Sequence, residues 1–219
     1  MDYDFMLKAL PTYITAMFLT IKLAMFGIFF SIIIGFLCNF LLLKKNIFLD
    51  KIVNMYIEIS RNTPLLIQLF FLYYGLTKFG FKISGTLCAI LGLSFLGGSY
   101  MSEALRAGIE AVPKNQIESG LSLGMNKIQL FKYVILPQAI SISIPLIAAN
   151  SIFLLKETSV VGIIAIKELM NVTKSFIGIY YKTYESLLLL VIFYLIIILP
   201  FSLFLSFIER RLRYAEHGN

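Results

Sequence analysis

Three long stretches of this chain carry no charged side chain: residues 23–43, 133–155 and 186–208. Each is about as long as the 20 or so apolar residues that an α-helix needs to cross the hydrocarbon core of a bilayer. The mean hydropathy of +0.87 and the charged fraction of 14% are also far from the values of soluble domains. We therefore expect an all-α integral membrane protein, in which each stretch is or contains a spanning helix.

Two further apolar regions bring the expected number of spans to about five. Residues 83–102 are similar in length but rich in glycine, which membrane helices tolerate because it lets neighbouring helices approach closely. Residues 62–77 are shorter, and reach bilayer length only if the helix begins near Ile52 and continues through Pro64. The boundaries of this second span are the least defined part of the expected fold, a single transmembrane domain over residues 1–219.

Basic residues set the expected orientation, because cytoplasmic loops carry an excess of Lys and Arg. Five spans place the two ends on opposite sides. With the N-terminus outside, the inner segments hold more basic residues than the outer ones, clustered at span ends as Lys44-Lys45 and Arg210-Arg211-Leu212-Arg213. We expect the N-terminus outside and the C-terminus in the cytoplasm. The net charge of +7 fits this topology and a bilayer with anionic headgroups, and no nucleic-acid-binding module is visible.

The polar segment over residues 113–137 then becomes a cytoplasmic loop between the third and fourth spans. Pro113 suits the first turn of a short helix, and Gly124 can supply a left-handed cap at its C-terminal end. Asn126 can cap a second helix, which runs until Pro137 marks the return to the membrane. The resulting hairpin either lies on the membrane surface or docks into a groove of another protein, and both readings fit its pattern.

The order of residues in this loop resembles a known motif. Glu118-Ser119-Gly120, then Gly124, then Val134-Ile135-Leu136-Pro137 has the spacing of the EAA motif, in which Glu-Ala-Ala is followed after three residues by Gly and after nine more by Ile-x-Leu-Pro. That motif marks the membrane subunits of binding-protein-dependent ABC importers. The departure at Ser119-Gly120 keeps the residues small, although a glycine inside a helix costs roughly 1 kcal/mol and would loosen the first helix of the loop.

Other stretches narrow the resemblance. RNTPLLIQLFFLYYGL (residues 61–76), SYMSEALRAGIEAVPK (99–114) and NSIFLLKETSVVGIIAIKELM (150–170) look like the permeases for polar amino acids of the histidine and glutamine type. Together the motifs cover the chain from about Thr12 to Arg213. The resemblance implies a multi-pass protein of the bacterial inner (cytoplasmic) membrane that forms the translocation path of an ATP-driven importer of polar amino acids.

The resemblance also implies a set of partners. These are a second permease chain, identical or related, two ATP-binding subunits in the cytoplasm, and an extracytoplasmic binding protein that delivers the amino acid. The chain lacks a Gly-x-x-x-x-Gly-Lys phosphate loop and a soluble domain large enough for a nucleotide. We therefore expect that it is not an enzyme and binds no cofactor, and that ATP and Mg²⁺ are bound by the partner ATPase.

The residues expected to couple the chain to the ATPase lie in the loop. Glu118 is expected to contact the ATPase, and Gly124 to let the two backbones approach, since a Cβ there would obstruct the turn and the contact. The alternative for Gly124 is a helix cap with no role toward a partner. The full set that the motif implies is Glu118, Ser119, Gly120, Gly124 and Pro137.

Charged residues within membrane depth are costly and are therefore candidates for the translocation path. Lys156 and Glu157 interrupt an apolar region next to two hydroxyl residues. A zwitterionic amino acid offers an ammonium and a carboxylate, so opposite charges in the path can serve as its partners. An intersubunit salt bridge would look the same in the sequence.

Further polar residues allow two interpretations each. Glu103 stands three residues before Arg106, beside a Gly-Gly-Ser-Tyr stretch, and can face the path. The Glu58 and Arg61 pair has the same spacing, and we interpret it as mutual neutralisation near the cytoplasmic interface. Gln68 and Asn150 are path candidates too, although a hydrogen bond between helices is the simpler reading of both.

Three other functions fit parts of the sequence. A secondary, ion-coupled transporter would also carry midplane charges, but the chain shows no internal repeat. A membrane scaffold that recruits a cytoplasmic partner leaves Lys156 and Glu157 unexplained. A membrane enzyme or metal site needs clustered His, Cys or carboxylate groups. Here Cys38 and Cys88 lie in apolar runs and the single histidine, His217, lies in the polar tail, so we expect no metal site.

Overall fold

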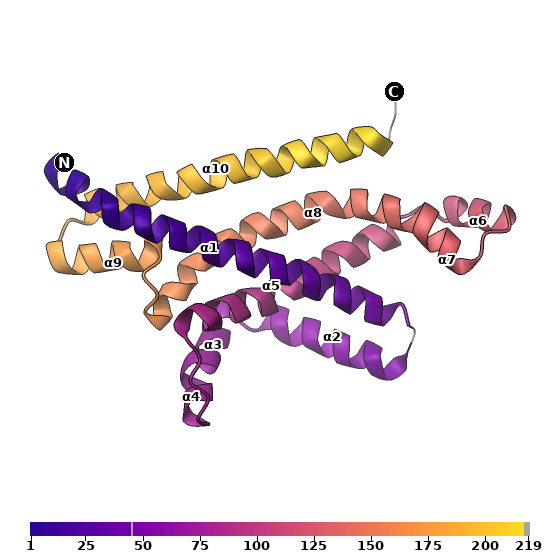
Figure 1. The fold of residues 1–219 in the computed structure, drawn as a ribbon, viewed down its shortest axis with the longest axis horizontal. Coiled ribbons are helices and arrows are strands. Elements are labelled where there is room, and N and C mark those ends of the chain that lie inside the picture. The colour runs from indigo at the N-terminus through magenta and orange to yellow at the C-terminus, as the bar shows by residue number, and fades with distance from the viewer. Residues whose placement is uncertain (45, 217–219) are drawn as a thin grey trace.

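The computed structural model describes residues 1–44 and 46–216, with side chains for 1–44 and 46–211, and over this part of the chain it is built from helices alone (Figure 1). Within the described residues, four helical stretches are long and apolar enough to cross a membrane: Tyr3–Leu42, Gly85–Glu110, Lys127–Ile164 and Thr183–Arg211. The prediction of an all-α membrane protein is confirmed.

The elements, in chain order, are α1 (Tyr3–Leu42), α2 (Ile47–Asn62), α3 (Leu65–Phe70), the π-turn η1 (Phe71–Gly75), α4 (Leu76–Lys78), α5 (Gly85–Glu110), α6 (Lys114–Ser122), α7 (Lys127–Leu130), the π-turn η2 (Phe131–Ile135), α8 (Leu136–Glu157), the 3-10 segment η3 (Thr158–Ile164), α9 (Leu169–Tyr180) and α10 (Thr183–Glu216). The stretch from α7 to η3 is continuous, and we call it the rod (Lys127–Ile164).

The expected second span is not one helix. Helix α2 ends at Asn62, and Thr63 and Pro64 are extended, with ψ of 124° and 140°. Proline has no N–H to continue the helical ladder and keeps the preceding residue out of the α region. The apolar helix that follows, Leu65–Lys78, is too short to cross a bilayer. Among the described residues, four continuous spans and one interrupted stretch, α2 to α4, therefore stand where about five spans were predicted.

The centre of the molecule is the contact between α1 and α5, the most extensive one between two helices. Glycines allow the close approach. A Cβ on Gly27 would lie 2.9 Å from the Cβ of Leu93, and one on Gly35 would lie 2.7 Å from the Cβ of Met101. Asn39 adds a hydrogen bond of 2.9 Å from its Nδ2 to the carbonyl oxygen of Ser102. Small residues at helix crossings are how membrane helices gain packing contacts.

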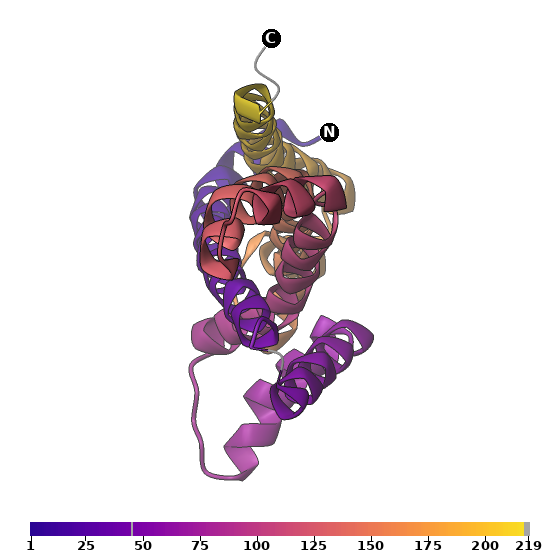
Figure 2. The same ribbon diagram turned by 90° about the vertical axis from the view of Figure 1, so that its right-hand side faces the viewer.

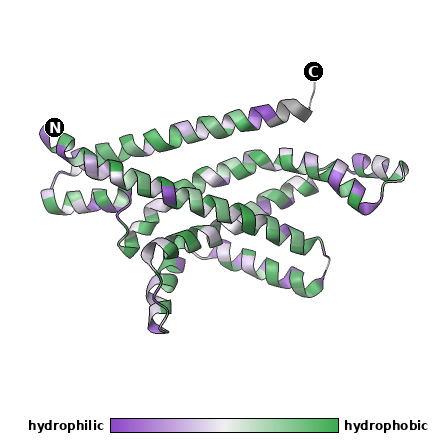
Figure 3. Cartoon of the chain, viewed as in Figure 1, coloured by the Kyte–Doolittle hydropathy of each residue, from purple (hydrophilic) through white to green (hydrophobic). Residues whose placement is uncertain are grey.

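The long helices define two ends of the molecule. Figure 1 shows the N-terminus, α9 and the start of α10 at one end, and α6, α7 and the last turns of α10 at the other. At the first end the hydroxyl of Tyr13 lies 3.0 Å from Thr173 Oγ1 and 3.1 Å from the Ser186 carbonyl, which ties α1 to α9 and α10. Hydrophobic residues follow the long helices, whereas hydrophilic residues gather around α6 and α7 (Figure 3).

Candidate functional site

A pocket of about 240 Å³ lies where α2, α3, α5, α8 and η3 meet, and we call it the charge pocket. Arg61, from the last turn of α2, and Glu157, the last residue of α8, both line it. Pro64, Leu66, Tyr100 and Phe153 supply apolar and aromatic walls. The pocket therefore presents one cation and one carboxylate within a largely apolar surface, an arrangement suited to a small zwitterion.

Arg61 is held by α5 and not by its neighbour on α2. Its Nη1 lies 3.2 Å from Glu103 Oε2, and the guanidinium stacks over the ring of Tyr100 at 5.3 Å. The predicted pairing of Arg61 with Glu58 is replaced by this contact between two helices, and Glu58 is exposed. Arg61 reaches Glu103 because α2 packs on α5. At this contact the Tyr56 hydroxyl donates to the Phe95 carbonyl at 2.7 Å.

Glu103 binds both Arg61 and Arg106, and these three residues form a charged cluster beside the charge pocket. The same Oε2 atom accepts from Arg106 Nη2 at 2.9 Å, so one carboxylate serves two guanidinium groups. Glu103 does not line the charge pocket itself. Two cations and one anion leave a net positive charge on this cluster, of which only Arg61 lines the charge pocket together with Glu157.

Lys156 points elsewhere. It is exposed, does not line the charge pocket, and is adjacent to Glu157 on a helix, where neighbouring residues do not face each other. The predicted pair of Lys156 and Glu157 is therefore not a pair in space. Arg61 is the cation that shares the pocket with Glu157.

The two predicted amide residues are placed by hydrogen bonds near the pocket. Asn150 Nδ2 donates to the Tyr100 carbonyl at 3.1 Å, which links α8 to α5. Gln68 Nε2 donates to the carbonyls of Ser60 and Thr63, at 3.1 and 2.9 Å, and so bridges the break between α2 and α3. Both residues therefore form hydrogen bonds between helices, which is the simpler of the two interpretations given for them above.

The hairpin over residues 113–137 has the predicted local structure. Gly124 is left-handed, with φ of 76°, and the Met125 N–H donates to the Gly120 carbonyl at 3.2 Å. Asn126 caps α7 through a capping box with Gln129, whose Oε1 accepts from the Asn126 N–H at 3.0 Å. Pro113 differs from the prediction, because it is the N-cap residue of α6 and precedes the first turn.

Within the hairpin the motif residues face different ways. Glu118 and Ser119 are exposed on α6, next to the exposed apolar side chains of Leu121 and Leu123. Gly120 is buried, and a Cβ there would lie 2.5 Å from Leu130 Cδ1. Gly120 therefore lets α6 pack onto α7, where a loosened helix was expected.

The second half of the hairpin is continuous with the pocket. Helix α7 and the π-turn η2 begin the rod, and Pro137 is the second residue of α8, which follows the π-turn. Glu157 lies 30 residues after Lys127 on the same rod, or about 45 Å at 1.5 Å per residue. One continuous helical element therefore connects the hairpin to a wall of the charge pocket.

A second acidic residue, Glu168, lies outside the four spans and is completely buried. Its carboxylate caps α9 by accepting from the N–H groups of Met170 and Asn171 at 2.7 and 2.6 Å. Burial raises the pKa of Glu168 to about 7, against the two N–H donors, which lower it. A Cβ on Gly162 would lie 2.7 Å from Glu168 Oε1, so this carboxyl group packs directly against η3.

The sequence prediction did not select Arg61 or Glu168. For Arg61 a signal was present in Pro64, because a helix that ends there leaves Arg61 at its last turn, free to pair with another element. For Glu168 the signal was its position directly before an apolar helical segment, where acidic residues cap helices.

Comparison with known proteins gives a consistent set of relatives. The family described as "Binding-protein-dependent transport system inner membrane component" matches residues 27–214. The chain is 34% identical over 212 residues, 95% of each protein, to the probable amino-acid permease protein YxeN of Bacillus subtilis (strain 168). It is 32% identical over 196 residues, 88% of each, to the probable amino-acid ABC transporter permease protein PatM of Vibrio harveyi.

Solved structures resemble the chain over nearly its whole length. The crystal structure of an amino acid ABC transporter with histidines contains a chain with a TM-score of 0.91 and 31% identity, covering 96% of this chain and 99% of that one. A chain of the MetNI methionine ABC transporter in an inward-facing conformation has a TM-score of 0.79 at 19% identity, covering 94% of this chain and 98% of that one, which is a likeness of fold.

Proposed function

Because the chain belongs to the family of binding-protein-dependent transport system inner membrane components, we propose that it forms the translocation path of an ATP-driven amino-acid importer. It is a multi-pass inner-membrane permease subunit and not the ATPase of its transporter. The observation that carries the proposal for the substrate is the charge pocket, in which Arg61 and Glu157 line one small cavity.

The substrate class follows from the chemistry of this pocket. Arginine binds carboxylates through a planar fork of donors, and a carboxylate accepts hydrogen bonds from an ammonium group. A free α-amino acid carries both groups. The apolar wall of Leu66, Tyr100 and Phe153 leaves room for a side chain. Relatives that are named as amino-acid permeases support the same class.

Family membership implies ATPase subunits and a binding protein as partners. We propose the finer composition of two ATPase subunits, a second permease chain, and a binding protein on the outer side. ATP and Mg²⁺ would be held by the ATPase. The basic residues at the span ends support an orientation with the hairpin and the C-terminus in the cytoplasm and the N-terminus outside.

The hairpin is the proposed contact with the ATPase. Glu118, Ser119 and the exposed Leu121 and Leu123 form its outer surface, while Gly120 serves its internal packing. Closure of the ATPase pair on ATP would displace the hairpins. Since α7 begins the rod, the displacement would move Glu157 relative to Arg61 and change the charge pocket.

The test is uptake by the purified complex in liposomes, with radiolabelled amino acids and either ATP inside the vesicles or an imposed ion gradient. We expect uptake that needs ATP, the ATPase and the binding protein. Uptake driven by a proton or sodium gradient without the ATPase would identify an ion-coupled carrier instead. An ATPase that co-purifies with a chain incapable of any uptake would identify a scaffold.

A further inference from the structure

Lys22 lies in the middle of α1, the longest of the described helices, and its side chain is exposed. Gly27 and Ser31, five and nine residues further along, face α5, where the Ser31 hydroxyl lies 3.3 Å from the Leu93 carbonyl oxygen. At about 100° per residue they lie on the side of α1 opposite Lys22. Figure 2, viewed along the long helices, shows α1 at the edge of the bundle. Lys22 therefore faces away from the rest of the chain.

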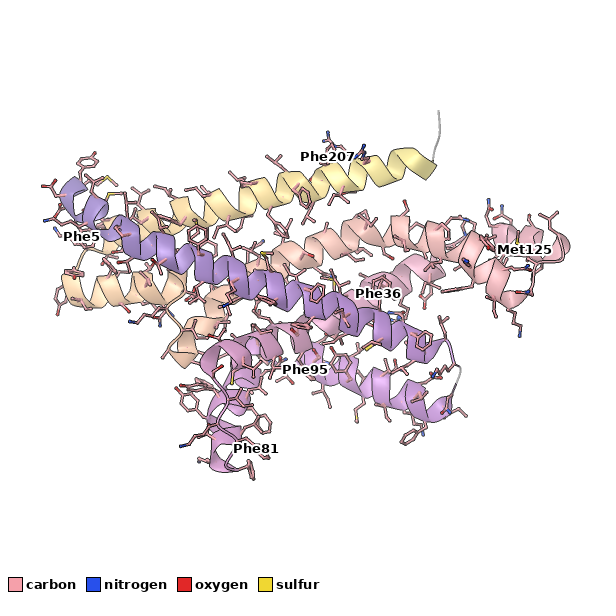
Figure 4. All side chains as sticks on the ribbon, in the orientation of Figure 1. Phe5, Phe36, Phe81, Phe95, Met125 and Phe207 are labelled. Atoms are coloured by element: carbon pink, nitrogen blue, oxygen red, sulfur yellow. The ribbon has the colours of Figure 1, made fainter. Side chains whose placement is uncertain are left out.

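A depression of about 430 Å³ surrounds Lys22 on this outward face. Its other lining residues are all apolar and all come from α1: Phe18, Ile21, Met25, Phe26 and Phe29. Exposed apolar side chains continue along the same face toward the end of the helix, and Figure 4 labels one of them, Phe36. We call this row the α1 stripe: Met25, Phe29, Ile33, Phe36 and Phe40.

The ammonium group of Lys22 has no counter-ion within the described part of the chain. No ion pair or hydrogen bond involves it there. The single acidic residue of α1 is Asp4, 18 residues or about 27 Å away at 1.5 Å per residue. A charged side chain among apolar groups at a membrane is costly unless it reaches water or an anion. An anion from outside the chain can supply the missing partner.

The depth of Lys22 identifies the kind of anion. The charge-free run that follows Lys22 ends at Lys44, so the two lysines are 22 residues apart, or about 33 Å along a helix. The hydrocarbon core of a bilayer is about 30 Å thick. Lys22 and Lys44 therefore lie at the two headgroup levels, and Lys22 lies at the outer one in the proposed orientation. The phosphate groups of anionic phospholipids lie at this depth and attract basic side chains.

The α1 stripe matches the other part of a phospholipid. One leaflet supplies about half of the hydrocarbon core, or about 15 Å. From Lys22 to Ile33 the helix rises about 16 Å over 11 residues. Met25, Phe29 and Ile33 are exposed along this length. An acyl chain whose phosphate is held at Lys22 would therefore lie on apolar side chains through the whole of its leaflet.

We propose that this face of α1 binds an anionic phospholipid of the outer leaflet, with the phosphate against Lys22 Nζ and an acyl chain along the stripe from Met25 to Ile33. The leaflet rests on the proposed orientation, whereas the site itself needs only that α1 crosses a bilayer. Binding of the lipid is measured without transport, so this inference and the proposed import function can fail separately.

Native mass spectrometry of the purified, delipidated transporter tests the site, with phosphatidylglycerol as the anionic probe and phosphatidylcholine as the zwitterionic one. Lys22→Gln should bind phosphatidylglycerol roughly five- to tenfold more weakly, because it loses a charged partner of the phosphate. Lys22→Arg keeps the charge and should bind as the unmodified protein does. Lys8→Gln is the matched control, since Lys8 is exposed on the same helix but about 21 Å before Lys22, beyond the headgroup level.

Thermal unfolding in detergent gives a second measurement, because a ligand that binds the folded protein raises its melting temperature. Phosphatidylglycerol should raise the melting temperature of the unmodified protein and of Lys8→Gln more than that of Lys22→Gln, and phosphatidylcholine should not distinguish them. Without lipid, Lys22→Gln should be as stable as the unmodified protein, since it removes only an exposed charge without a partner among the described residues.

Equal binding of phosphatidylglycerol by Lys22→Gln and Lys8→Gln would overturn the proposal. Equal affinity of the unmodified protein for the two lipids would overturn it as well. If Lys22→Gln kept its lipid but lost a membrane protein that otherwise co-purifies, the occupant of this face would be a protein carboxylate and the lipid site would be wrong.

Discussion

Arg61 on α2 and Glu103 on α5 are 42 residues apart in the chain, yet Nη1 of the first lies 3.2 Å from Oε2 of the second. Because Arg106 binds the same oxygen, Glu103 anchors Arg61 to α5 at the rim of the charge pocket. The carboxylate thus determines where the cation of the pocket lies. We therefore expect Glu103 to act in transport by holding Arg61 in place, without contacting the substrate.

Glu103→Gln should raise the KM for amino-acid uptake by about tenfold, because a hydrogen bond to a charged group contributes roughly 1.5–3 kcal/mol and the amide keeps part of it. Uptake at saturating substrate should change less, since the substituted side chain would not touch the substrate. Glu58→Gln, at an exposed carboxylate on α2, is the control and should leave KM unchanged. Equal effects of the two substitutions would contradict the positional role.

Glu157→Gln should weaken the binding of the substrate ammonium group and raise KM by roughly 10- to 100-fold, as expected when a charged hydrogen-bond partner is lost. The neighbouring Lys156→Gln removes an exposed charge outside the pocket and should have little effect. Uptake kinetics of both variants in liposomes measure this. A larger effect at Lys156 than at Glu157 would show that the pocket is not the binding site.

Substitutions at Gly124 separate its role in the turn from a role toward the ATPase. Gly124 has φ of 76° and no other group within 4 Å of a Cβ, so Gly124→Ala should strain the turn by about 1–2 kcal/mol without any clash. Asn tolerates this conformation. Gly124→Asn should therefore leave thermal unfolding nearly unchanged and, if the backbone approaches the ATPase here, abolish co-purification and uptake. Normal uptake by the Asn variant would leave Gly124 as a helix cap only.

The stability of the protein should fall between about pH 4.5 and 7 because of Glu168. Its folded pKa of about 7 lies above the ordinary value of 4.5, so the stabilisation is complete below pH 4.5 and is lost as the pH rises through 7. The difference between these two pKa values corresponds to a change in the free energy of unfolding on the order of 3 kcal/mol. Thermal unfolding in detergent at pH 5 and pH 8 measures it. Glu168→Gln keeps one of the two capping oxygens and should remove most of this dependence. An unchanged pH profile in that variant would exclude Glu168 as its source.

Gly108→Ala should destabilise the contact between α5 and α8. A Cβ at Gly108 would collide with Ser143 Oγ and with the carbonyl oxygen of Ala139, and overpacking of this kind costs about 1–3 kcal/mol. Gly178→Ala, in α9, meets nothing within 4 Å and should be neutral or stabilise by up to about 1 kcal/mol. Melting temperatures of the two variants in one detergent should move in opposite directions, and a loss of equal size in both would argue against the close helix contact.

Local features of the chain were the most predictable. The long apolar runs identified the spans, and the left-handed Gly124 and the cap at Asn126 were predicted because each depends on bonds within a few residues. The second span was predicted wrongly as a continuous helix. Apolar content favoured a helix through Pro64, but the missing N–H and the restriction on Thr63 decided the backbone.

The charge pocket was only partly predictable, because it depends on how separate helices pack. Glu157 was selected as a charge in an apolar region, but the cation of the site was expected next to it in the chain, whereas the cation that lines the same pocket is Arg61, almost a hundred residues away. Spacing along one helix cannot reveal that α2 docks on α5. Gly120 was misread for the same reason, since its use becomes visible only with Leu130 placed against it.

The contact between α1 and α5 also limits how this chain can change over generations. Gly27 faces Leu93 and Gly35 faces Met101 with no spare volume on either side. The atoms opposite Gly27 all belong to the side chain of Leu93, whereas Gly35 also faces backbone atoms of Met101 and Ser102. Selection for function from a Gly27→Ala parent should therefore recover second-site revertants with a smaller residue at Leu93, whereas a Gly35→Ala parent should mostly revert at position 35 itself.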